Sequence, residues 1–361
     1  MSSSPSSSSE PPSSSLAPSP APTNSVVIKG YTVEVNDAML MGVGGFGVVL
    51  RATARGEQVA LKVMVGSQPH ITASALHEHD TLFGDSALPM HKNVVVLHSY
   101  EEVDGSDESA QALIGAVSVR LRAKTDDPVA QKHRLHESLE PEQVVHLLAY
   151  EVLEGPTLYD MLVARRSPLL LSEVLPLFRQ LAAAVAHCHA HGVAHLDVKL
   201  ENALVVDGGR RLVLIDFGLA RPFPLPAPLQ ERNPPGSPTF IAPEVRAACE
   251  PGGAGLFDGH RADVFSLGVV LYSLLVGSYP WRDTVDSDSV YLRFSRTGHL
   301  SAARRLEPPG YAIGPPVGQP TDPLVAAPVA GTGPACATCW HTTSCTRCSS
   351  SKCRSAPRWR R

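Results

Sequence analysis

Long apolar runs are missing from this chain of 361 residues. Its longest largely apolar stretch covers residues 264–276, whereas a helix needs about 20 apolar residues to cross a bilayer. We therefore expect this stretch to form a buried core helix, and we expect no transmembrane segment. The first residues, MSSSP, also lack the basic and apolar regions of a secretory signal.

An excess of basic charge is missing too. The chain has 31 Lys and Arg against 35 Asp and Glu, so we expect no nucleic-acid partner. Cysteine is scarce before residue 336, because five of the seven cysteines lie between residues 336 and 353. Such clustering is unlike a disulfide framework, so we expect a reducing, cytoplasmic location, with the nucleus as an alternative. Hydrophobic residues make up 43% of the chain, enough for a core.

Composition divides the chain into three parts. Residues 1–24 are mostly Ser, Pro and Ala, which bury too little apolar surface to offset the entropy of ordering, so we predict a disordered tail. Residues 25–300 alternate apolar runs with turns, and residues 301–361 form a Pro/Gly/Cys-rich low-complexity tail. The middle part is expected to contain strands within 37–65, a helix over 71–83, a strand over 94–97, a polar insertion over about 101–141, a strand over 144–152 and a helix from Ser172 to Gly192.

Two short runs carry most of the functional information. Residues 195–202 read HLDVKLEN, and residues 216–218 read DFG. Between them, the apolar runs 203–206 and 212–215 flank the turn DGG, a pattern that predicts a β-hairpin. The chain is rich in predicted strands at first and in predicted helices later, so we predict the α+β fold class.

A glycine-rich run at residues 42–49, GVGGFGVV, fits the pattern G-x-G-x-x-G-x-V. Glycines let backbone N–H groups approach phosphate oxygens without a Cβ in the way. The same pattern occurs in dinucleotide-binding folds and in ordinary glycine-rich hairpins. A dinucleotide fold would need a helix directly after the glycines, whereas here the apolar run 59–62, VALK, predicts a strand.

Lys62 ends that apolar run. Burying an ammonium group is costly unless it is paired. A phosphate and the carboxylate of Glu78, on the predicted helix, would pair it. In the alternative interpretation, the Lys62 side chain extends along the surface to water.

Together with the run 242–244, APE, these motifs stand in an order that resembles a eukaryotic protein kinase catalytic domain of the Ser/Thr type. The resemblance covers residues 31–300. It implies a bilobal fold, with a small antiparallel sheet and one helix in residues 25–152 and a mainly helical lobe in residues 153–300. The run 263–268, DVFSLG, is similar to the calcium/calmodulin- and AMP-activated-type group.

The resemblance also implies the reaction, which is transfer of the γ-phosphate of Mg-ATP to Ser or Thr hydroxyls of protein substrates. Asp197 would accept or orient the substrate hydroxyl proton, and Lys199 would contact the γ-phosphate. Lys62, paired with Glu78, would hold the other phosphates. Mg²⁺ would be held by Asn202 and Asp216. The implied nucleotide-binding residues are Gly42, Gly44, Gly47, Val49, Ala60, Lys62, Glu151 and Leu153.

Three further residues receive roles from the resemblance. Tyr150 would guard the back of the nucleotide pocket, although it is also a plain strand aromatic. His195 is expected to pack and orient the loop rather than act as a base. Asp263, on the predicted core helix, would accept hydrogen bonds from the catalytic-loop backbone, because a buried Asp needs such partners.

Two departures from the family concern regulation. Leu196 stands where many members have an Arg that binds a phosphate on the activation segment. That segment, residues 221–235, contains no Ser, Thr or Tyr. We therefore hypothesise that activity does not require phosphorylation of this segment. Lys199 and Ser237 favour Ser/Thr substrates.

After residue 300 the resemblance ends, and the helices that finish the large lobe in the family have no counterpart. A buried Glu244 would then need a partner, with Arg304 and Arg305 as candidates. A rival interpretation is a nucleotide-binding pseudokinase or scaffold, and a regulatory partner could complete the lobe. The tail has two C-x-x-C pairs, at 336–339 and 345–348, which are consistent either with a zinc site or with an unstructured tail.

Overall fold

The computed structural model describes residues 25–66, 68–85, 87–123, 139–165, 167–224 and 234–300, and the backbone of residues 304–305. The expected disordered tail and the cysteine pairs lie outside these residues. So does most of the proline-rich part of the activation segment.

The first lobe is built on an antiparallel sheet with the strand order β1-β2-β4-β5-β7-β6, to which β3 adds by pairing with β4. Two of its hairpins close with two-residue turns, Lys29-Gly30 and Arg55-Gly56, and all four residues have positive φ. Such turns match the twist of the strands that they join. The strands are β1 (Ser25–Ile28), β2 (Tyr31–Glu34), β3 (Leu40–Val43), β4 (Val48–Ala54), β5 (Glu57–Val65), β6 (Leu97–Asp104) and β7 (Val144–Tyr150).

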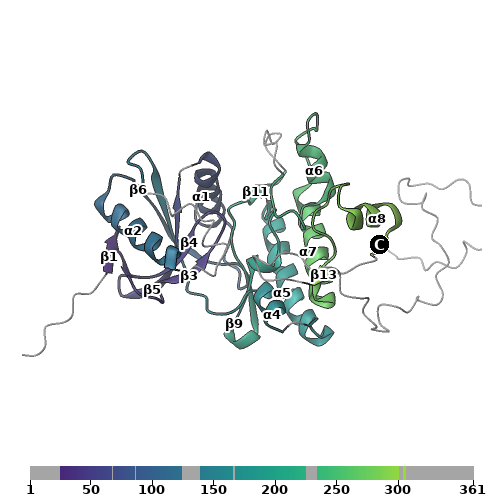
Figure 1. The fold of residues 1–361 in the computed structure, drawn as a ribbon, viewed down its shortest axis with the longest axis horizontal. Helices are drawn as coiled ribbons and strands as arrows, with labels where there is room; N and C mark the ends of the chain where they lie inside the picture. The colour runs from purple at the N-terminus through teal and green to yellow at the C-terminus, as the bar shows by residue number, and fades with distance from the viewer. Residues whose placement is uncertain are drawn as a thin grey trace, which may run out of the picture. The chain divides into compact units, whose positions relative to one another are not determined.

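Two helices cover the two faces of this sheet, α1 (Pro69–Leu82) and α2 (Glu108–Ala123). Alternate residues of a strand point to opposite faces. Accordingly, Met64 of β5 belongs to the apolar cluster that contains Ala75 of α1, whereas its neighbour Val63 joins the cluster that contains Leu113 of α2. The sheet is thus the middle layer of three (Figure 1).

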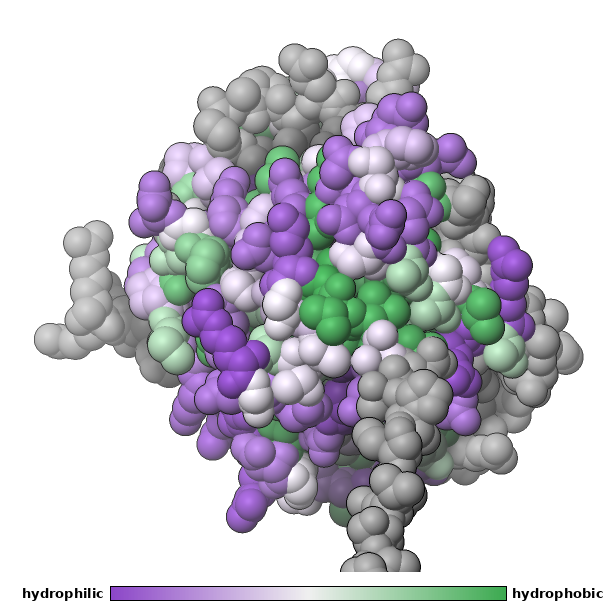
Figure 2. Space-filling view, turned by 90° about the vertical axis from the view of Figure 1, so that its left-hand side faces the viewer, coloured by the Kyte–Doolittle hydropathy of each residue, from purple (hydrophilic) through white to green (hydrophobic). Residues whose placement is uncertain are grey.

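The segment between β6 and β7 differs from the expected polar insertion over 101–141. Strand β6 continues to Asp104, and residues 108–123 form helix α2. The helix buries Ala110, Leu113, Ile114, Val117 and Leu121, which recur at helical spacing among polar residues. Figure 2 looks onto the end of the molecule that carries α2 and β1, and it shows a small apolar patch within a polar surface.

A strand was expected over 94–97, but β6 begins only at Leu97. Val94 instead makes a single parallel bridge with Leu214 of the second lobe. The apolar residue Val94 therefore takes part in a contact between the two lobes.

The second lobe is mainly helical, as predicted. The predicted hairpin is confirmed as β9 (Ala203–Val206) and β10 (Arg211–Leu214). The long helix α5 (Leu171–Ala190) begins one residue before the expected cap Ser172, because the carboxylate of Glu173 accepts from the N–H of Leu170. The other elements are α4 (Leu158–Arg165), α6 (Pro243–Cys249), α7 (Gly259–Val276), α8 (Ser289–Thr297) and the short strands β8 (Val193–Ala194), β11 (Arg221–Pro222), β12 (Ser278–Tyr279) and β13 (Arg304–Arg305).

Helix α7 is the one described helix whose length and hydropathy would suffice to cross a membrane, and half of that window is buried in the protein. It contains the stretch for which the sequence predicts a core helix. It packs against α5, and Val270 and Leu274 are fully buried there.

Candidate active site

The glycine-rich turn joins β3 to β4 and lies over β5. Gly42 is the strand partner of Val49, and Val49 is in turn the partner of Lys62. The turn closes through a 2.9 Å hydrogen bond from the N–H of Gly44 to the carbonyl of Gly47. A Cβ on Gly47 would lie 2.4 Å from the carbonyl oxygen of Val63, so glycine is required there.

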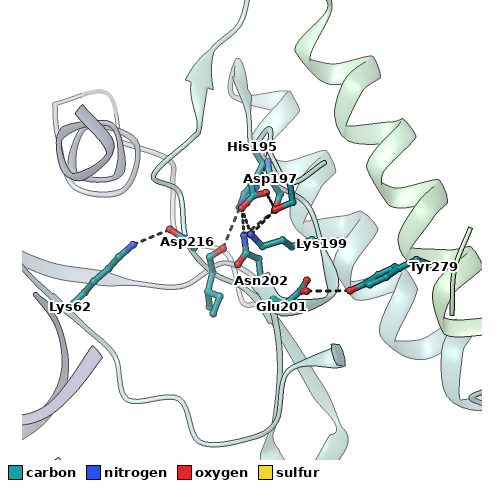
Figure 3. A network of polar contacts seen from close by, with 10 residues as sticks. Lys62, His195, Asp197, Lys199, Glu201, Asn202, Asp216 and Tyr279 are labelled. Carbon is teal, nitrogen blue, oxygen red and sulfur yellow. Dashed lines mark hydrogen bonds and ion pairs between the residues drawn. The ribbon is translucent and has the colours of Figure 1, made fainter. Parts of the chain in front are cut away.

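Lys62 forms the predicted pair with Glu78. Its Nζ lies 2.6 Å from Oε2 of Glu78 and 2.9 Å from Oδ1 of Asp216, and Figure 3 shows the latter contact. Burial lowers the pKa of the Lys62 ammonium, but the charges of Asp216 and Glu78 outweigh it and raise the pKa above its ordinary value. The alternative of a surface-exposed Lys62 is wrong, because the residue is buried.

Glu78 joins α1 to the DFG segment. Its side chain is 1% exposed, and its Oε1 accepts a hydrogen bond of 3.3 Å from the N–H of Phe217. The position of α1 therefore sets both Lys62 and the backbone beside Asp216. Asp216 has a φ of 64°, in the left-handed region. Burial alone would raise the pKa of its carboxyl, but the Lys62 ammonium lowers it below the ordinary range.

The strand that ends at Tyr150 forms the edge of the expected nucleotide pocket. Ala60 is the strand partner of Tyr150, and the N–H of Glu151 donates to the carbonyl of Val96. Leu153 is partly buried against the main core. The Tyr150 hydroxyl is buried and has no hydrogen-bond partner among the described residues. Burial, followed by the charge of Glu78, raises the pKa of this hydroxyl well above its ordinary value.

Asp197 is the centre of the catalytic loop (Figure 3). Its Oδ2 accepts from Nζ of Lys199 at 2.6 Å and from Nδ2 of Asn202 at 3.0 Å. Its Oδ1 accepts from the hydroxyl of Ser237 at 2.9 Å. The same hydroxyl accepts from Lys199 at 3.0 Å, so Ser237 bridges the two residues. Burial lowers the pKa of Lys199, but the charge of Asp197 outweighs it and raises the pKa.

Asn202 is oriented by two hydrogen bonds from its amide nitrogen, to the side chain and to the carbonyl of Asp197. Its amide oxygen therefore remains available as an acceptor. Asp216 supplies a charged carboxylate nearby (Figure 3). No group of three or more His, Cys, Asp or Glu among the described residues could hold a metal. A carboxylate and an amide oxygen nevertheless fit Mg²⁺, which takes oxygen ligands and binds through few protein groups plus phosphates and water.

Helix α7 anchors the backbone of the catalytic loop through Asp263, whose side chain is fully buried. Oδ2 accepts from the N–H of His195 and Oδ1 from the N–H of Leu196, both at 2.8 Å. The predicted role of Asp263 is confirmed. A third bond joins Oδ2 to Nε2 of His189 at 2.8 Å, and nothing in the sequence pattern indicates it. Leu196 is held with a φ of 62°.

His195 packs as predicted. It is completely buried, and its ring meets that of Phe217 edge-on at 4.7 Å between ring centres. Its Nε2 lies 3.3 Å from the carbonyl oxygen of Ile215. The residue thus connects the catalytic loop to the DFG segment.

Leu196 belongs to a small apolar cluster in the second lobe. Leu196 is 7% exposed, and it packs with residues of α6, α7 and the segment before α6. Gly236, with a φ of 109°, passes so close that a Cβ there would lie 2.7 Å from the carbonyl oxygen of Leu196. The other buried members of the cluster are Ala194, Ile241, Ala242, Val245 and Ala262.

Two residues differ from expectation. Glu244 is exposed, so the prediction of a buried carboxylate in need of an Arg is wrong, because water solvates the charge. Glu201 received no role from the sequence, yet its Oε1 accepts from the hydroxyl of Tyr279 at 3.2 Å (Figure 3). Burial raises the pKa of Glu201. Only its place inside HLDVKLEN could have singled it out.

Comparison with known proteins agrees with this geometry. The family model described as "Protein kinase domain" matches residues 124–308, just over half of the chain. The chain is 33% identical over 194 residues to testis-specific serine/threonine-protein kinase 3 of Mus musculus, covering 54% of this chain and 68% of that protein. The Homo sapiens protein of the same name gives the same values.

The match to a plant relative covers a smaller share of that relative's length. Serine/threonine-protein kinase SRK2B of Arabidopsis thaliana is 31% identical over 219 residues, which is 56% of each chain. The glycine-rich turn and Lys62 precede the residues that the family model matches, and for them the geometry described above is the evidence. The chain therefore belongs to the protein kinase domain family and is a kinase of the serine/threonine type.

Proposed function

We propose that this chain is a catalytically active, ATP-dependent kinase of protein Ser and Thr residues, and that it does not require phosphorylation of its activation segment. The observation that carries the proposal is a pair of polar networks, one of Lys62, Glu78 and Asp216 and one of Asp197, Lys199 and Asn202. Every side chain expected to touch phosphate, metal or the substrate hydroxyl is present and oriented by a neighbour.

The first lobe would hold the nucleotide. The N–H of Glu151 donates to the carbonyl of Val96, and the carbonyl of Glu151 would accept from an adenine amino group, with the backbone of Leu153 beside it. Val49 and Ala60 would contact the ring from above. The charged Lys62 would bind phosphate oxygens, and the turn of Gly42, Gly44 and Gly47 would bring N–H groups over them.

Asn202 and Asp216 would hold Mg²⁺ through an amide oxygen and a carboxylate. When bound, the metal neutralises charge on the phosphate oxygens. Asp216 already lies beside Lys62, so the cations that act on the phosphates would converge there.

Asp197 would handle the proton of the substrate hydroxyl. Lys199 and Asn202 both donate to its Oδ2, whereas among the described residues only Ser237 donates to its Oδ1. A substrate Ser or Thr hydroxyl could replace that bond and donate to Oδ1. Positioned acid–base groups of this kind contribute roughly 10²–10⁴-fold to rates. Lys199 would stay charged beside the transferring phosphate.

The surroundings of Leu196 support the proposed independence from phosphorylation. A phosphate-binding Arg at this position would need a polar surrounding, but the position is occupied by an apolar side chain within an apolar cluster. The loop is held instead by Asp263 and by the contact of Gly236 with Leu196. These contacts would keep the loop in this conformation without a phosphate.

The test is a radiolabelled Mg-ATP assay on the purified full chain with a generic basic protein as acceptor. We expect label transfer by the wild type and at least a 100-fold loss for Asp197→Asn and for Lys62→Met. Phosphatase treatment should leave the rate unchanged.

Nucleotide that raises the melting temperature without any label transfer would support the pseudokinase alternative instead. An activating phosphate found by mass spectrometry at Ser237 or Thr239 would contradict the proposed independence from phosphorylation.

A further inference from the structure

Helix α7 is apolar on all sides, with Arg261 and Asp263 as its only charged residues in 18 positions. Helices of this kind are normally buried in a protein core. Here only half of the helix window is buried. Of the remainder, Phe265, Leu267 and Leu271 are partly buried against the main core. The exposed side with Val264, Gly268 and Leu275 is the part that needs an explanation.

The exposed side forms an apolar strip, in which Leu271 is partly buried. Val264 is 60% exposed and Leu275 is 39% exposed, and eleven residues of helix separate them by about 17 Å. Gly268 and Leu271 lie between them on the same face by helical spacing. A Cβ on Gly268 would meet no atom within 4 Å, so the middle of the strip is also open.

The start of α5 extends the strip at the C-terminal end of α7. The N–H of Leu169 donates to the carbonyl of Leu274 at 3.1 Å, which brings the start of α5 close to the C-terminal end of α7. Leu170 and Leu171 are 63% and 57% exposed. Apolar patches that continue across two elements usually mark an interaction site. We call the surface formed by Val264, Gly268, Leu271, Leu275, Leu170 and Leu171 the α7 face.

The chain itself returns to this surface. Strand β12 directly follows the α7 cap Gly277, and β13 pairs with β12 in the register Ser278↔Arg305 and Tyr279↔Arg304. Figure 1 shows β13 beside α7. Arg305, the last described residue, therefore lies beside the C-terminal end of α7. Residues 306–314, LEPPGYAIG, contain one charged residue, Glu307, and three large apolar residues, Leu306, Tyr311 and Ile313.

We propose that residues 306–314 bind along the α7 face as an extended segment and complete the core of the second lobe. Nine residues in a polyproline-type conformation reach about 28 Å at about 3.1 Å per residue, more than the strip requires. Pro308 and Pro309 fix φ in advance, which reduces the entropy lost on binding. The short tether from β13 also gives the segment a high effective concentration at the face.

The binding would stabilise the lobe without taking part in the chemistry, because none of these residues is in the active site. The test compares the full chain with the triple variant Leu306→Ser, Tyr311→Ser, Ile313→Ser. We expect its melting temperature to fall by roughly 4–8 °C, and its binding of a hydrophobic dye to rise. The matched control is Val317→Ser, Leu324→Ser, Val325→Ser, which makes the same kind of change further along the chain and should alter neither measurement.

A double variant of the receiving surface, Val264→Ser with Leu275→Ser, makes the test specific. Both positions are exposed, so these changes alone should not prevent folding. If the segment binds there, the two sets of substitutions combined should lower the melting temperature by less than the sum of their separate effects.

Additive effects, or equal effects of the two tail triples, would overturn the proposal. So would a wild-type dimer, seen by light scattering, that the surface variant dissociates and the 306–314 variant leaves intact. That outcome would assign the α7 face to a second copy of the chain.

Discussion

The two lobes differ in how completely their described residues cover apolar surface. In the first lobe α1 and α2 cover both faces of the sheet, whereas in the second lobe α7 keeps an apolar side open. Yet α7 supplies the anchor of the catalytic loop through Asp263. Apolar contacts therefore bury surface, whereas polar contacts such as those of Asp263 position the active site. Substitutions should separate effects on stability from effects on activity.

The largest expected effect is on the polar anchor in the open lobe. Asp263→Asn would turn one of the two acceptor oxygens into a donor facing a backbone N–H, which leaves buried groups unpaired. We expect at least a 100-fold loss of kcat, and a loss of unfolding free energy of about 3 kcal/mol. Steady-state kinetics and denaturant unfolding check this.

The control for the anchor lies on the same helix. Asp258 caps α7 by accepting from the N–H of Arg261, and Asn is an equally good cap. Asp258→Asn should change both quantities little. Equal losses for the two variants would mean that Asp263 acts only through general stability of α7.

The second effect concerns the covered lobe. Leu113 of α2 is fully buried against the outer face of the sheet, and Leu113→Ala should cost about 2–5 kcal/mol of unfolding free energy by leaving a cavity. Val119→Ala on the exposed side of α2 should cost far less. We expect the KM for ATP and kcat of the folded Leu113→Ala protein to change little. A large change in kcat would show that α2 contributes to the site as well as to the fold.

How far the sequence determines these features depends on the kind of contact. Lys62, Glu78, Asp197 and Asp263 could be placed in advance, because a buried charge on an apolar element requires a specific partner. Helix α2 was missed although its apolar residues recur at helical spacing. Its packing could not be placed, because nothing in the sequence shows that the outer sheet face is free to receive it.

The prediction of a strand over 94–97 was wrong for a related reason. Its apolar residues are needed, but Val94 meets Leu214 of the other lobe and does not continue β6. The exposure of Glu244 and the contact of Lys62 with Asp216 likewise depend on how the two lobes fold up, which local patterns do not encode.

The third expected effect is a pH dependence of stability that arises where α1 contacts the sheet of the first lobe. His146 of β7 is 1% exposed, and its Nδ1 lies 2.9 Å from the Tyr100 hydroxyl and 3.6 Å from Oε1 of Glu102. On the other side, its Nε2 lies 3.4 Å from the hydroxyl of Thr72 on α1. Burial lowers the pKa of His146, and Glu102 opposes this only in part.

The neutral ring of His146 is therefore favoured in the fold. Its contribution to stability is complete above the unfolded-state pKa of about 6.5, and it declines as the pH falls below that value, by at most about 1.4 kcal/mol per pH unit. His146→Gln should remove this part of the pH dependence in denaturant unfolding measured from pH 8 to 5. His98→Gln, at an exposed position of β6, should leave it unchanged. An identical pH dependence in wild type and His146→Gln would assign the effect to other groups.

The smallest effect is expected for the ion pair of Arg51 on β4 with Glu154, which follows β7. Its atoms lie 2.8 Å apart, but the side chains are 38% and 70% exposed. Exposed pairs contribute about 0–1 kcal/mol, and salt screens them. Arg51→Gln should therefore lower the unfolding free energy by less than about 1 kcal/mol, and the difference should vanish in about 1 M salt. A larger, salt-resistant loss would mean that the Arg51 stem, by packing on the sheet, adds to the covering of the first lobe.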